Sequence, residues 1–276
     1  MCLPTGLGRV RRAPAVMDGS PIFVVNLAGA TVRWERIAQN LCQVGLSRYE
    51  RFEAVDGRRL PDAVLRERVD HDFFCTWYGR PPSPGEVGCT LSHLGAYARF
   101  LETRAPFVVV LEDDALVLPE TVALLEDVRL QAWLAADAPR VLLLSAADRY
   151  LKRGAIPLGA GHRLTRVRNA WLAHAYLINR AGAGLLLARQ KPIRFLVDDW
   201  LDLDMVWGLQ VSCVQPPCAS LHETAAASSL DPDRHGLRAN ARAPALAKRL
   251  RRLLRRLADA LYYKPFCGLD KGAGPR

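Results

Sequence analysis

A continuous apolar run at residues 107–111, Phe-Val-Val-Val-Leu, is followed directly by Glu112, Asp113 and Asp114. Such a run is typical of a strand buried on both faces of a sheet that helices cover. In open α/β sheets, ligands bind beyond the carboxyl ends of the strands. Three crowded carboxylates repel one another unless a cation lies among them, and hard oxygen ligands favour Mn²⁺ or Mg²⁺. The sequence therefore predicts a metal site at these three acids; the alternative is a turn whose acids are solvated.

Strand-like and helix-like segments alternate along the rest of the chain. Short apolar runs predict strands at 21–27, 51–55, 107–111, 141–145, 171–179 and 211–214. Helices are expected at 31–44, 85–103 and 180–190, and residues 58–84 are expected to be irregular. This alternation predicts an α/β fold with a mostly parallel central sheet.

Two glycines mark the expected start of the helix at 85–103. Gly85 and Gly88 would let the backbone approach a ligand closely, and Ser92 and His93 follow about two turns into the helix. This spacing indicates a binding cleft lined by Ser92 and His93. The alternative is an ordinary helix start with His93 hydrogen-bonded in the core.

A third group of acids lies at residues 198–204, among hydrophobic neighbours. A carboxylate partly shielded by Trp200 could serve as a general base, because burial raises its pKa towards the working pH. Asp198 and Asp199 are the candidates. The alternative is that one of them caps the start of a helix.

The basic residues of the chain are concentrated near its C-terminal end. Residues 242–264 contain eight basic residues and one acid, and so carry seven of the ten net positive charges. Leucines recur there at steps of three and four, as on one face of a helix: Leu246, Leu250, Leu253, Leu254, Leu257 and Leu261. A basic amphipathic helix over residues 245–264 is predicted to bind an anionic membrane surface. The alternative is a helix that packs its leucines on the domain. Nucleic acid is not expected as a partner, because aromatic residues are not interleaved with the basic ones.

The chain is expected to form one large domain at 18–223. A disordered leader is expected at 1–17, and a linker followed by the basic amphipathic tail at 224–276. No 18-residue stretch is apolar throughout, which argues against an ordinary transmembrane helix. The seven cysteines are irregularly spaced, which argues against a zinc site and fits a reducing compartment. With no secretory signal found, a cytoplasmic location is expected.

Several motifs occur in order between residues 21 and 215. They are the strand at 21–27 with the arginine-bearing segment 33–37, Phe-Glu-Ala-Val-Asp-Gly at 52–57, Gly-Glu-Val-Gly-Cys-Thr-Leu-Ser-His at 85–93, Val-Leu-Glu-Asp-Asp at 110–114, and His-Ala-Tyr-Leu-Ile-Asn-Arg at 174–180. Together they resemble bacterial glycosyltransferase family 25, the lipooligosaccharide biosynthesis enzymes that include β-1,4-galactosyltransferases. Trp34 stands where members of the family often carry a second arginine.

The resemblance implies a Rossmann-like GT-A fold, a UDP-hexose donor and an inverting transfer. Mn²⁺ or Mg²⁺ would be held by Asp114 with Asp113 or Glu112. The residues implied at the donor are Asn26, Arg33, Asp56, Ser92, His93, Glu112, Asp113 and His174. Asp198 is the first candidate for the base and Asp199 the second.

The function implied is that of a hexosyltransferase, with galactose as the expected sugar. The acceptor implied is a saccharide on a lipid-linked core oligosaccharide, so that the basic tail would hold the enzyme at the inner membrane. Two other classes remain open: a metal-dependent phosphohydrolase that uses the same acids, and a catalytically degenerate interaction protein at a membrane surface.

Overall fold

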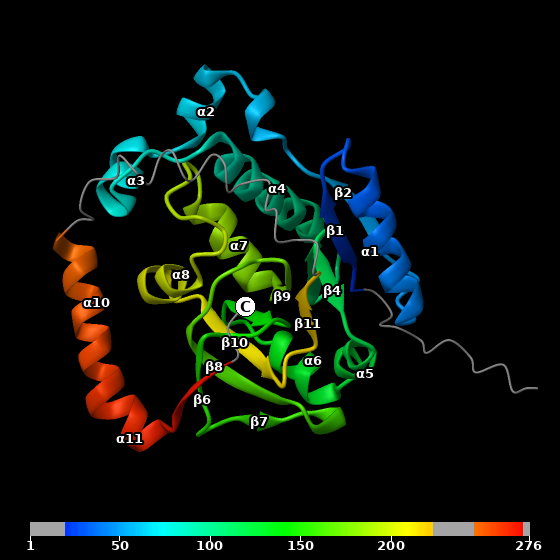
Figure 1. Cartoon of the computed structure of the whole chain (residues 1–276), viewed down its shortest axis with the longest axis vertical. Helices are drawn as coiled ribbons and strands as arrows, with labels where there is room; N and C mark the ends of the chain where they lie inside the picture. Colours follow the sequence, from blue (N-terminus) through cyan, green and yellow to red (C-terminus); the bar gives the residue numbers. More distant parts are fainter. Residues whose placement is uncertain (1–19, 223–245, 273–276) are drawn as a thin grey trace, which may run out of the picture.

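The computed structural model describes residues 20–222 and 246–272, and a large mixed sheet lies at its centre (Figure 1). The predicted leader at 1–17 and the linker at 224–245 lie outside the described residues. The order of the main sheet is β12-β6-β8-β10-β5-β9-β3-β1-β2, and β7 pairs with β8. Its strands are β1 Ile22–Asn26, β2 Glu50–Glu53, β3 Phe107–Glu112, β5 Arg140–Leu143, β6 Arg149–Leu151, β7 Ile156–Pro157, β8 Arg163–Asn169, β9 Ala175–Asn179, β10 Gln210–Gln215 and β12 Leu269–Lys271. A small second sheet pairs β4 Ala115–Val117 with β11 Ala219–Leu221.

The directions of the strands refine the expectation of a mostly parallel sheet. Strand β1 is parallel to both β2 and β3, and β5 is parallel to β10. Strand β9 lies between β3 and β5 and is antiparallel to both, and β8 is antiparallel to β10. The carboxyl ends of β1, β2 and β3 consequently meet at one edge, where parallel strands place ligand-binding residues.

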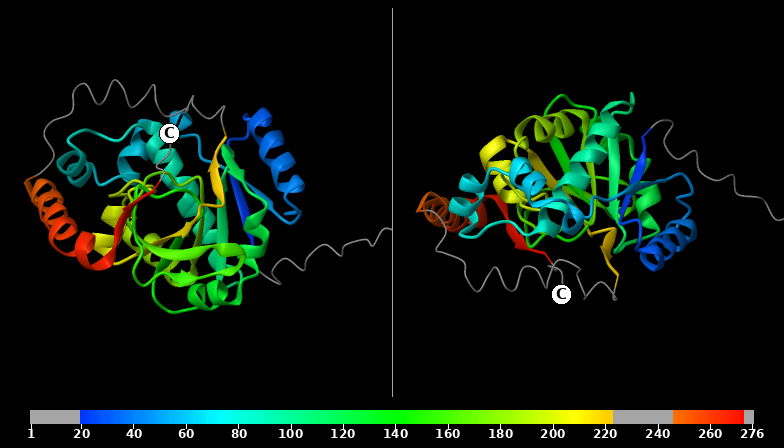
Figure 2. Two further views of the ribbon diagram at one scale, coloured as in Figure 1. Left: turned by 60° about the horizontal axis from the view of Figure 1, so that its bottom comes forward. Right: turned by 90° about the horizontal axis from the view of Figure 1, so that it is seen from above.

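Helices cover both faces of the sheet (Figures 1 and 2). They are α1 Thr31–Gln43, α2 Asp62–Arg68, α3 His71–Tyr78, α4 Pro84–Leu101, α5 Glu120–Leu125, α6 Val128–Leu134, α7 Arg180–Arg189, α8 Trp200–Trp207, α10 Leu246–Ala258 and α11 Lys264–Cys267. Alternate residues of β3 pack into opposite layers: Val108 and Val110 join the core under α3, α4, α7 and α8, while Val109 and Leu111 join the core under α1, α5 and α6. Burial on both faces explains why residues 107–111 of this strand are all apolar.

Helix α4 starts at a complete capping box. Ser83 Oγ accepts a hydrogen bond from the Glu86 amide, and the Glu86 carboxylate accepts one from the Ser83 amide. Arg80 binds the same carboxylate with two guanidinium nitrogens, at 2.7 and 2.8 Å. The helix start is therefore rigidly held, and it directs Cys89, Ser92 and His93 towards the carboxyl edge of the sheet.

Residues 58–84 are not irregular, so that prediction was wrong. They contain α2 and α3, and α3 begins where the Asp70 side chain accepts from the Phe73 amide. It ends at Gly79, whose φ of 75° suits glycine. Phe74 and Trp77 are buried on one face of this helix, but eight residues are too few to give a clear helical period.

Other differences concern strands. The strand expected at 171–179 forms only from Ala175, since Leu172 has a φ of 72° that interrupts extended backbone. Strands β6, β7 and β8 were not predicted. Strand β8 reads Arg-Leu-Thr-Arg-Val-Arg-Asn, and its buried Leu164 and Val167 are separated by polar residues that obscure the strand period.

The C-terminal segment packs on the domain through its polar side. In α10 the Arg255 guanidinium donates to the Arg168 carbonyl oxygen, and Asp259 in the π-helical turn after α10 pairs with Arg168 at 2.9 Å. Tyr263 lies under the Arg168 guanidinium, 3.9 Å from the ring centre. Beyond α11, β12 pairs with β6 and joins the sheet.

The leucines of this segment face away from the domain. The exposed fractions of the six leucines range from 46% to 81%; they are Leu246, Leu250, Leu253, Leu254, Leu257 and Leu261. The alternative in which the helix packs its leucines on the domain is therefore wrong. Among the described residues, no helix is both long and apolar enough to cross a bilayer.

Candidate functional site

A cavity of about 120 Å³ opens at the carboxyl ends of β1 and β3. Its polar lining includes eight of the eleven predicted site residues: Asn26, Arg33, Asp56, Ser92, His93, Glu112, Asp113 and Asp114. The cavity does not include His174, Asp198 or Asp199 in its lining. Residues separated by almost ninety positions thus meet in one place.

Asp113 is held by two groups from the β1–α1 region. Its Oδ2 accepts a hydrogen bond from Asn26 Nδ2 at 2.6 Å, and its Oδ1 lies 3.2 Å from Arg33 Nη1. Burial raises the pKa of Asp113, although Arg33 and Asn26 act in the opposite direction. Asn26 also accepts from Arg51, whose guanidinium lies over the Trp34 ring. Trp34 therefore supports an arginine that orients Asn26.

Glu112 belongs to a hydrogen-bonded chain that enters the core. Its Oε1 is 3.0 Å from His93 Nε2, and His93 Nδ1 is 2.7 Å from the Tyr176 hydroxyl, which contacts the Tyr97 hydroxyl. Burial acts to raise the pKa of Glu112, but the hydrogen bond and charge of His93 outweigh it and lower the pKa. Since the carboxylate can only accept, Nε2 carries a proton. In the neutral ring, Nδ1 then accepts from Tyr176, whose phenol stays protonated because burial raises its pKa.

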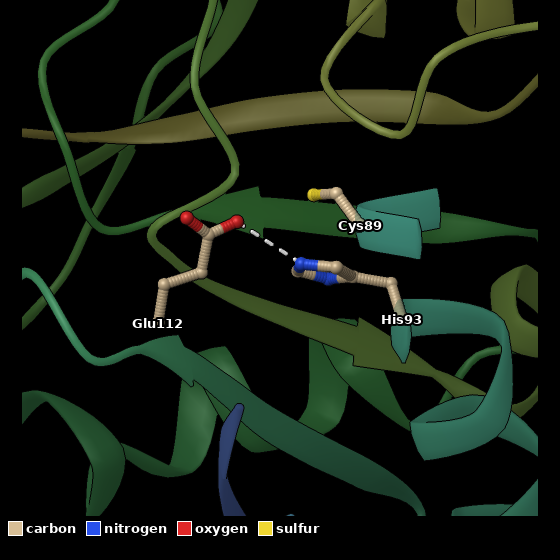
Figure 3. Close-up of side chains that lie close together, drawn as sticks. All are labelled: Cys89, His93 and Glu112. Carbon is tan, nitrogen blue, oxygen red and sulfur yellow. Dashed lines mark hydrogen bonds and ion pairs between the residues drawn. The ribbon is translucent and has the colours of Figure 1, made fainter. Parts of the chain in front are cut away.

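Cys89 lies beside this pair. It precedes His93 by four residues on α4, so the two side chains share one helix face. Figure 3 shows its sulfur near the Glu112–His93 hydrogen bond. Within the described part of the chain, Cys89, His93 and Glu112 form the one group of three ligand-type side chains whose ligand atoms all lie within 4.8 Å of one another. The sequence prediction missed Cys89, although the four-residue spacing was visible.

Asp114 differs from its two acidic neighbours. Its Oδ1 is buried and has no hydrogen-bond partner among the described residues. Burial, then the charges of Glu112 and Asp113, raise its pKa from 3.8 to about 7. An unpartnered carboxylate oxygen crowded by two other acids fits a divalent cation, which would supply the missing positive charge.

The turn after β2 forms the opposite wall of the cavity. A Cβ at Gly88 would lie 2.5 Å from the Gly57 nitrogen, so these two backbones touch only because both residues lack a side chain. Ser92 Oγ accepts from the Val55 amide and donates to the Gly88 carbonyl oxygen. Its hydroxyl therefore joins α4 to this turn. Asp56 caps the following turn through the Arg58 amide and lines the cavity.

A chain of contacts through two aromatic rings leads from His93 to the candidate bases. Tyr176, which contacts His93, packs edge-on against Trp200 with ring centres 5.2 Å apart, and Trp200 directly follows Asp199. Asp199 is buried at the start of α8 but makes no capping hydrogen bond there. Instead its Oδ2 accepts from the Tyr78 hydroxyl at 2.7 Å. Asp198 is half-buried beside it.

Helix α3 positions the acids of α8, a role that the sequence prediction missed. Burial, followed by the charge of Asp199, raises the pKa of Tyr78 well above 10, so this phenol remains a donor. The preceding residue, Trp77, donates its indole N–H to Asp202 at 2.8 Å. The aromatic content of residues 73–78 was the available signal.

His174 is buried, and neither ring nitrogen has a hydrogen-bond partner among the described residues. Burial lowers its pKa, which favours the neutral ring. Its carbonyl oxygen accepts from the Glu112 amide, so its backbone supports the acidic segment.

A polar, carboxylate-rich cavity at the carboxyl edge of the sheet lies where open α/β sheets bind their ligands. The sequence model of glycosyltransferase family 25, described as an LPS biosynthesis protein, matches residues 19–201. The chain therefore belongs to glycosyltransferase family 25.

Relatives of this chain occur in animals. A probable inactive glycosyltransferase 25 family member 3 from Bos taurus is 29% identical over 201 residues, which cover 71% of this chain and 33% of the relative. A glycosyltransferase 25 family member from Aedes aegypti is 29% identical over 189 residues, covering 66% and 30%. Procollagen galactosyltransferase 1-A from Xenopus laevis is 29% identical over 106 residues, covering 37% and 17%. The chain thus spans about a third of the length of the first two relatives.

Among solved structures, mannose-1-phosphate geranyltransferase from Thermus thermophilus covers 72% of this chain and 74% of its own, at 14% identity. The TM-score of 0.34 is too low to assign the fold.

Proposed function

We propose that this protein is an inverting hexosyltransferase with a GT-A fold, which transfers a hexose from a UDP-sugar to a glycan. Galactose is the first choice, since a procollagen galactosyltransferase is among the relatives. The observation that carries the proposal is the cavity at the ends of β1 and β3, where Asp114 keeps a buried oxygen without a partner among the described residues. The family description supports a lipooligosaccharide core as the acceptor.

The donor would lie in this cavity. Arg33, whose side chain is 30% exposed, would face the donor phosphates, and Asp56 would accept from the uracil or ribose. Asn26 holds Asp113 and thereby fixes Arg33. Asp114, assisted by Asp113 or Glu112, would hold Mn²⁺ or Mg²⁺. A cation bound there would offset the negative charge that builds on the leaving UDP.

The transfer itself needs a base on the acceptor side. The acceptor hydroxyl oxygen bonds to C1 of the hexose while the bond from C1 to the β-phosphate oxygen breaks. UDP leaves with that electron pair, and the hydroxyl proton passes to a carboxylate of the enzyme. Asp199 is the preferred base over Asp198, because the Tyr78 hydroxyl fixes the orientation of its carboxylate.

The exposed leucines of α10 support a membrane role. An apolar helix face on a strongly basic segment has the chemistry of a peripheral anchor on anionic lipid. We place the enzyme at the cytoplasmic side of an inner membrane, where a lipid-linked acceptor would be within reach.

Calorimetry of UDP binding tests the donor assignment. The native protein should bind UDP with Mn²⁺ and lose most of this affinity in EDTA, and Asp114→Ala should remove the manganese dependence. Glu120→Gln, which changes an exposed acid outside the cavity, is the control. Failure of the native protein to bind UDP under either condition would refute the assignment. Rapid release of sugar phosphate from a UDP-sugar without acceptor would indicate a phosphohydrolase instead.

A further inference from the structure

Three side chains that can bind a metal converge at one wall of the cavity (Figure 3). They are Cys89 and His93 from α4 and Glu112 from the end of β3, and their ligand atoms all lie within 4.8 Å of one another. This group differs in chemistry from the acids at positions 113 and 114, because it offers a sulfur and an imidazole nitrogen together with one carboxylate.

The spacing of the three ligand atoms is close to that around a zinc ion. Cys89 and His93 are four residues apart on one helix, which is the separation at which two helical side chains bind the same zinc ion. Bonds of about 2.0 Å to nitrogen or oxygen and about 2.3 Å to sulfur put the ligand atoms of a tetrahedral site roughly 3.3–3.6 Å apart. His93 Nε2 and Glu112 Oε1 are now 3.0 Å apart, so a small outward movement of the carboxylate would admit the ion.

Glu112 controls access of an ion to His93. The His93 side chain is fully buried, and its Nε2 is covered by the Glu112 carboxylate, whose side chain is 26% exposed. Rotation of this carboxylate towards the cavity uncovers Nε2, and Cys89 is half-buried beside it. An ion in the cavity would therefore reach all three ligands through a side-chain movement, without displacement of α4 or β3.

The hydrogen bonds behind His93 can hold its ring in the form that binds a metal. Binding through Nε2 requires the ring proton on Nδ1, which would then donate to the Tyr176 hydroxyl, 2.7 Å away. Tyr176 can in turn donate to the Tyr97 hydroxyl, since either of these two groups can act as the donor. The neutral ring keeps one proton throughout, and the Cys89 thiol releases its proton to solvent. One thiolate and one carboxylate then balance the two charges of the ion.

We propose that Cys89, His93 and Glu112 form a zinc site whose fourth position opens into the cavity. A thiolate with an imidazole favours Zn²⁺ over Mn²⁺ and Mg²⁺, which prefer oxygen ligands. Three protein ligands and an open position allow the ion to bind a water molecule or a ligand atom. With Glu112 on zinc, Asp113 would be the residue that assists Asp114 with the cation proposed there. The zinc site itself does not depend on a sugar donor.

Calorimetry of Zn²⁺ binding to the full chain, without nucleotide and with a phosphine reductant, tests this site. The native protein should have one tight site per chain. Cys89→Ser should weaken it at least about a hundredfold, because loss of a ligand costs more than the roughly 10–100-fold that follows loss of an outer-shell partner. Tyr176→Phe should weaken it about tenfold. Cys42→Ser is the matched control, since it changes an exposed thiol of α1 outside the cavity lining.

Co²⁺ in place of Zn²⁺ gives a second measurement. A thiolate bound to Co²⁺ produces a charge-transfer absorption in the near ultraviolet, which a carboxylate does not. This band should appear with the native protein and with Cys42→Ser, be absent with Cys89→Ser, and disappear when Zn²⁺ is added. The Tm of each variant in EDTA shows that the variants fold like the native chain.

Several results would overturn the proposal. The absence of a tight zinc site in the native protein would exclude it, as would an affinity that Cys89→Ser leaves unchanged. Loss of zinc binding in Asp114→Ala but not in Cys89→Ser would assign the ion to the acids alone. The donor proposal fails or stands separately, because the zinc titration contains no nucleotide. If UDP binds with Mn²⁺ and zinc does not bind, only the zinc site is wrong.

Discussion

Replacing Asp114 by Asn should stabilise the metal-free protein at neutral and alkaline pH. The Asp114 carboxyl is crowded by Glu112 and Asp113, and its pKa is raised from 3.8 to about 7, mainly by burial. A carboxyl whose pKa is raised on folding does not lower the free energy of unfolding at pH values below its unfolded pKa. As pH rises from the unfolded pKa through the folded pKa, its ionisation lowers the free energy of unfolding progressively. The neutral amide of Asn avoids that loss.

The size of the effect follows from the pKa change. A rise of about three units corresponds to a ceiling of about 4 kcal/mol at about 1.4 kcal/mol per unit. Solution counter-ions and water in the open cavity screen part of the repulsion, so a gain of about 1–3 kcal/mol is expected at pH 8. For a chain of this size, this is roughly 3–9 °C in Tm. The advantage should be small at pH 4, grow up to pH 7 and level off above it.

Thermal unfolding in EDTA between pH 4 and pH 9 measures this difference, with Glu120→Gln as the control that leaves Tm unchanged. Adding Mn²⁺ at pH 8 should raise the Tm of the native protein and not that of Asp114→Asn, which would reduce or reverse the gap. A variant that is less stable than the native protein at pH 8 in EDTA, or an advantage that does not change with pH, would refute the reasoning.

Three further predictions concern other parts of the molecule. Gly88→Ala puts a Cβ 2.5 Å from a backbone nitrogen of the opposing turn. It should lower the free energy of unfolding by about 3 kcal/mol and weaken UDP binding. A Tm within about 2 °C of the native value would contradict this close contact. Tyr78→Phe removes the hydrogen bond to Asp199 and should lower the transfer rate about tenfold while UDP affinity stays unchanged. An equal loss of transfer rate and UDP affinity would indicate that the substitution disturbs the whole fold. Leu257→Glu should reduce binding to anionic vesicles about tenfold in co-sedimentation, whereas Val128→Glu, a change at a more exposed apolar residue on α6, should not; equal effects would argue against α10 as the anchor.

The apolar run of β3 and the acids after it were sufficient to predict the buried strand and the location of the cavity. The separate partners of these acids could not be predicted, because neighbouring residues point in different directions and their partners come from distant segments. Glu112 turns to His93 on α4, whereas Asp113 turns to Asn26 on β1. Similarly, the apolar run at 175–179 predicts a strand but contains no information on its direction, so the antiparallel placement of β9 was not foreseen.

The leucine period at 246–261 indicates that one face of a helix is apolar, but it does not say which face meets the domain. That choice depends on long-range contacts such as Asp259 with Arg168, which sequence spacing does not reveal. The roles assigned to all eleven candidate site residues, His174, Asp198 and Asp199 included, stay predictions.

The pairing of β12 with β6 has a consequence for any shortened form of the protein. Strand β12 pairs with one side of β6. Just before β12, the carbonyl oxygens of Gly268 and Cys267 accept hydrogen bonds from the Lys152 and Arg153 amides, which follow β6. A chain that ends before α10 would leave these backbone groups open as a free edge, a surface that promotes aggregation through strand addition. Removing the tail would therefore change solubility as well as the proposed lipid binding, and single substitutions on the leucine face separate the two effects.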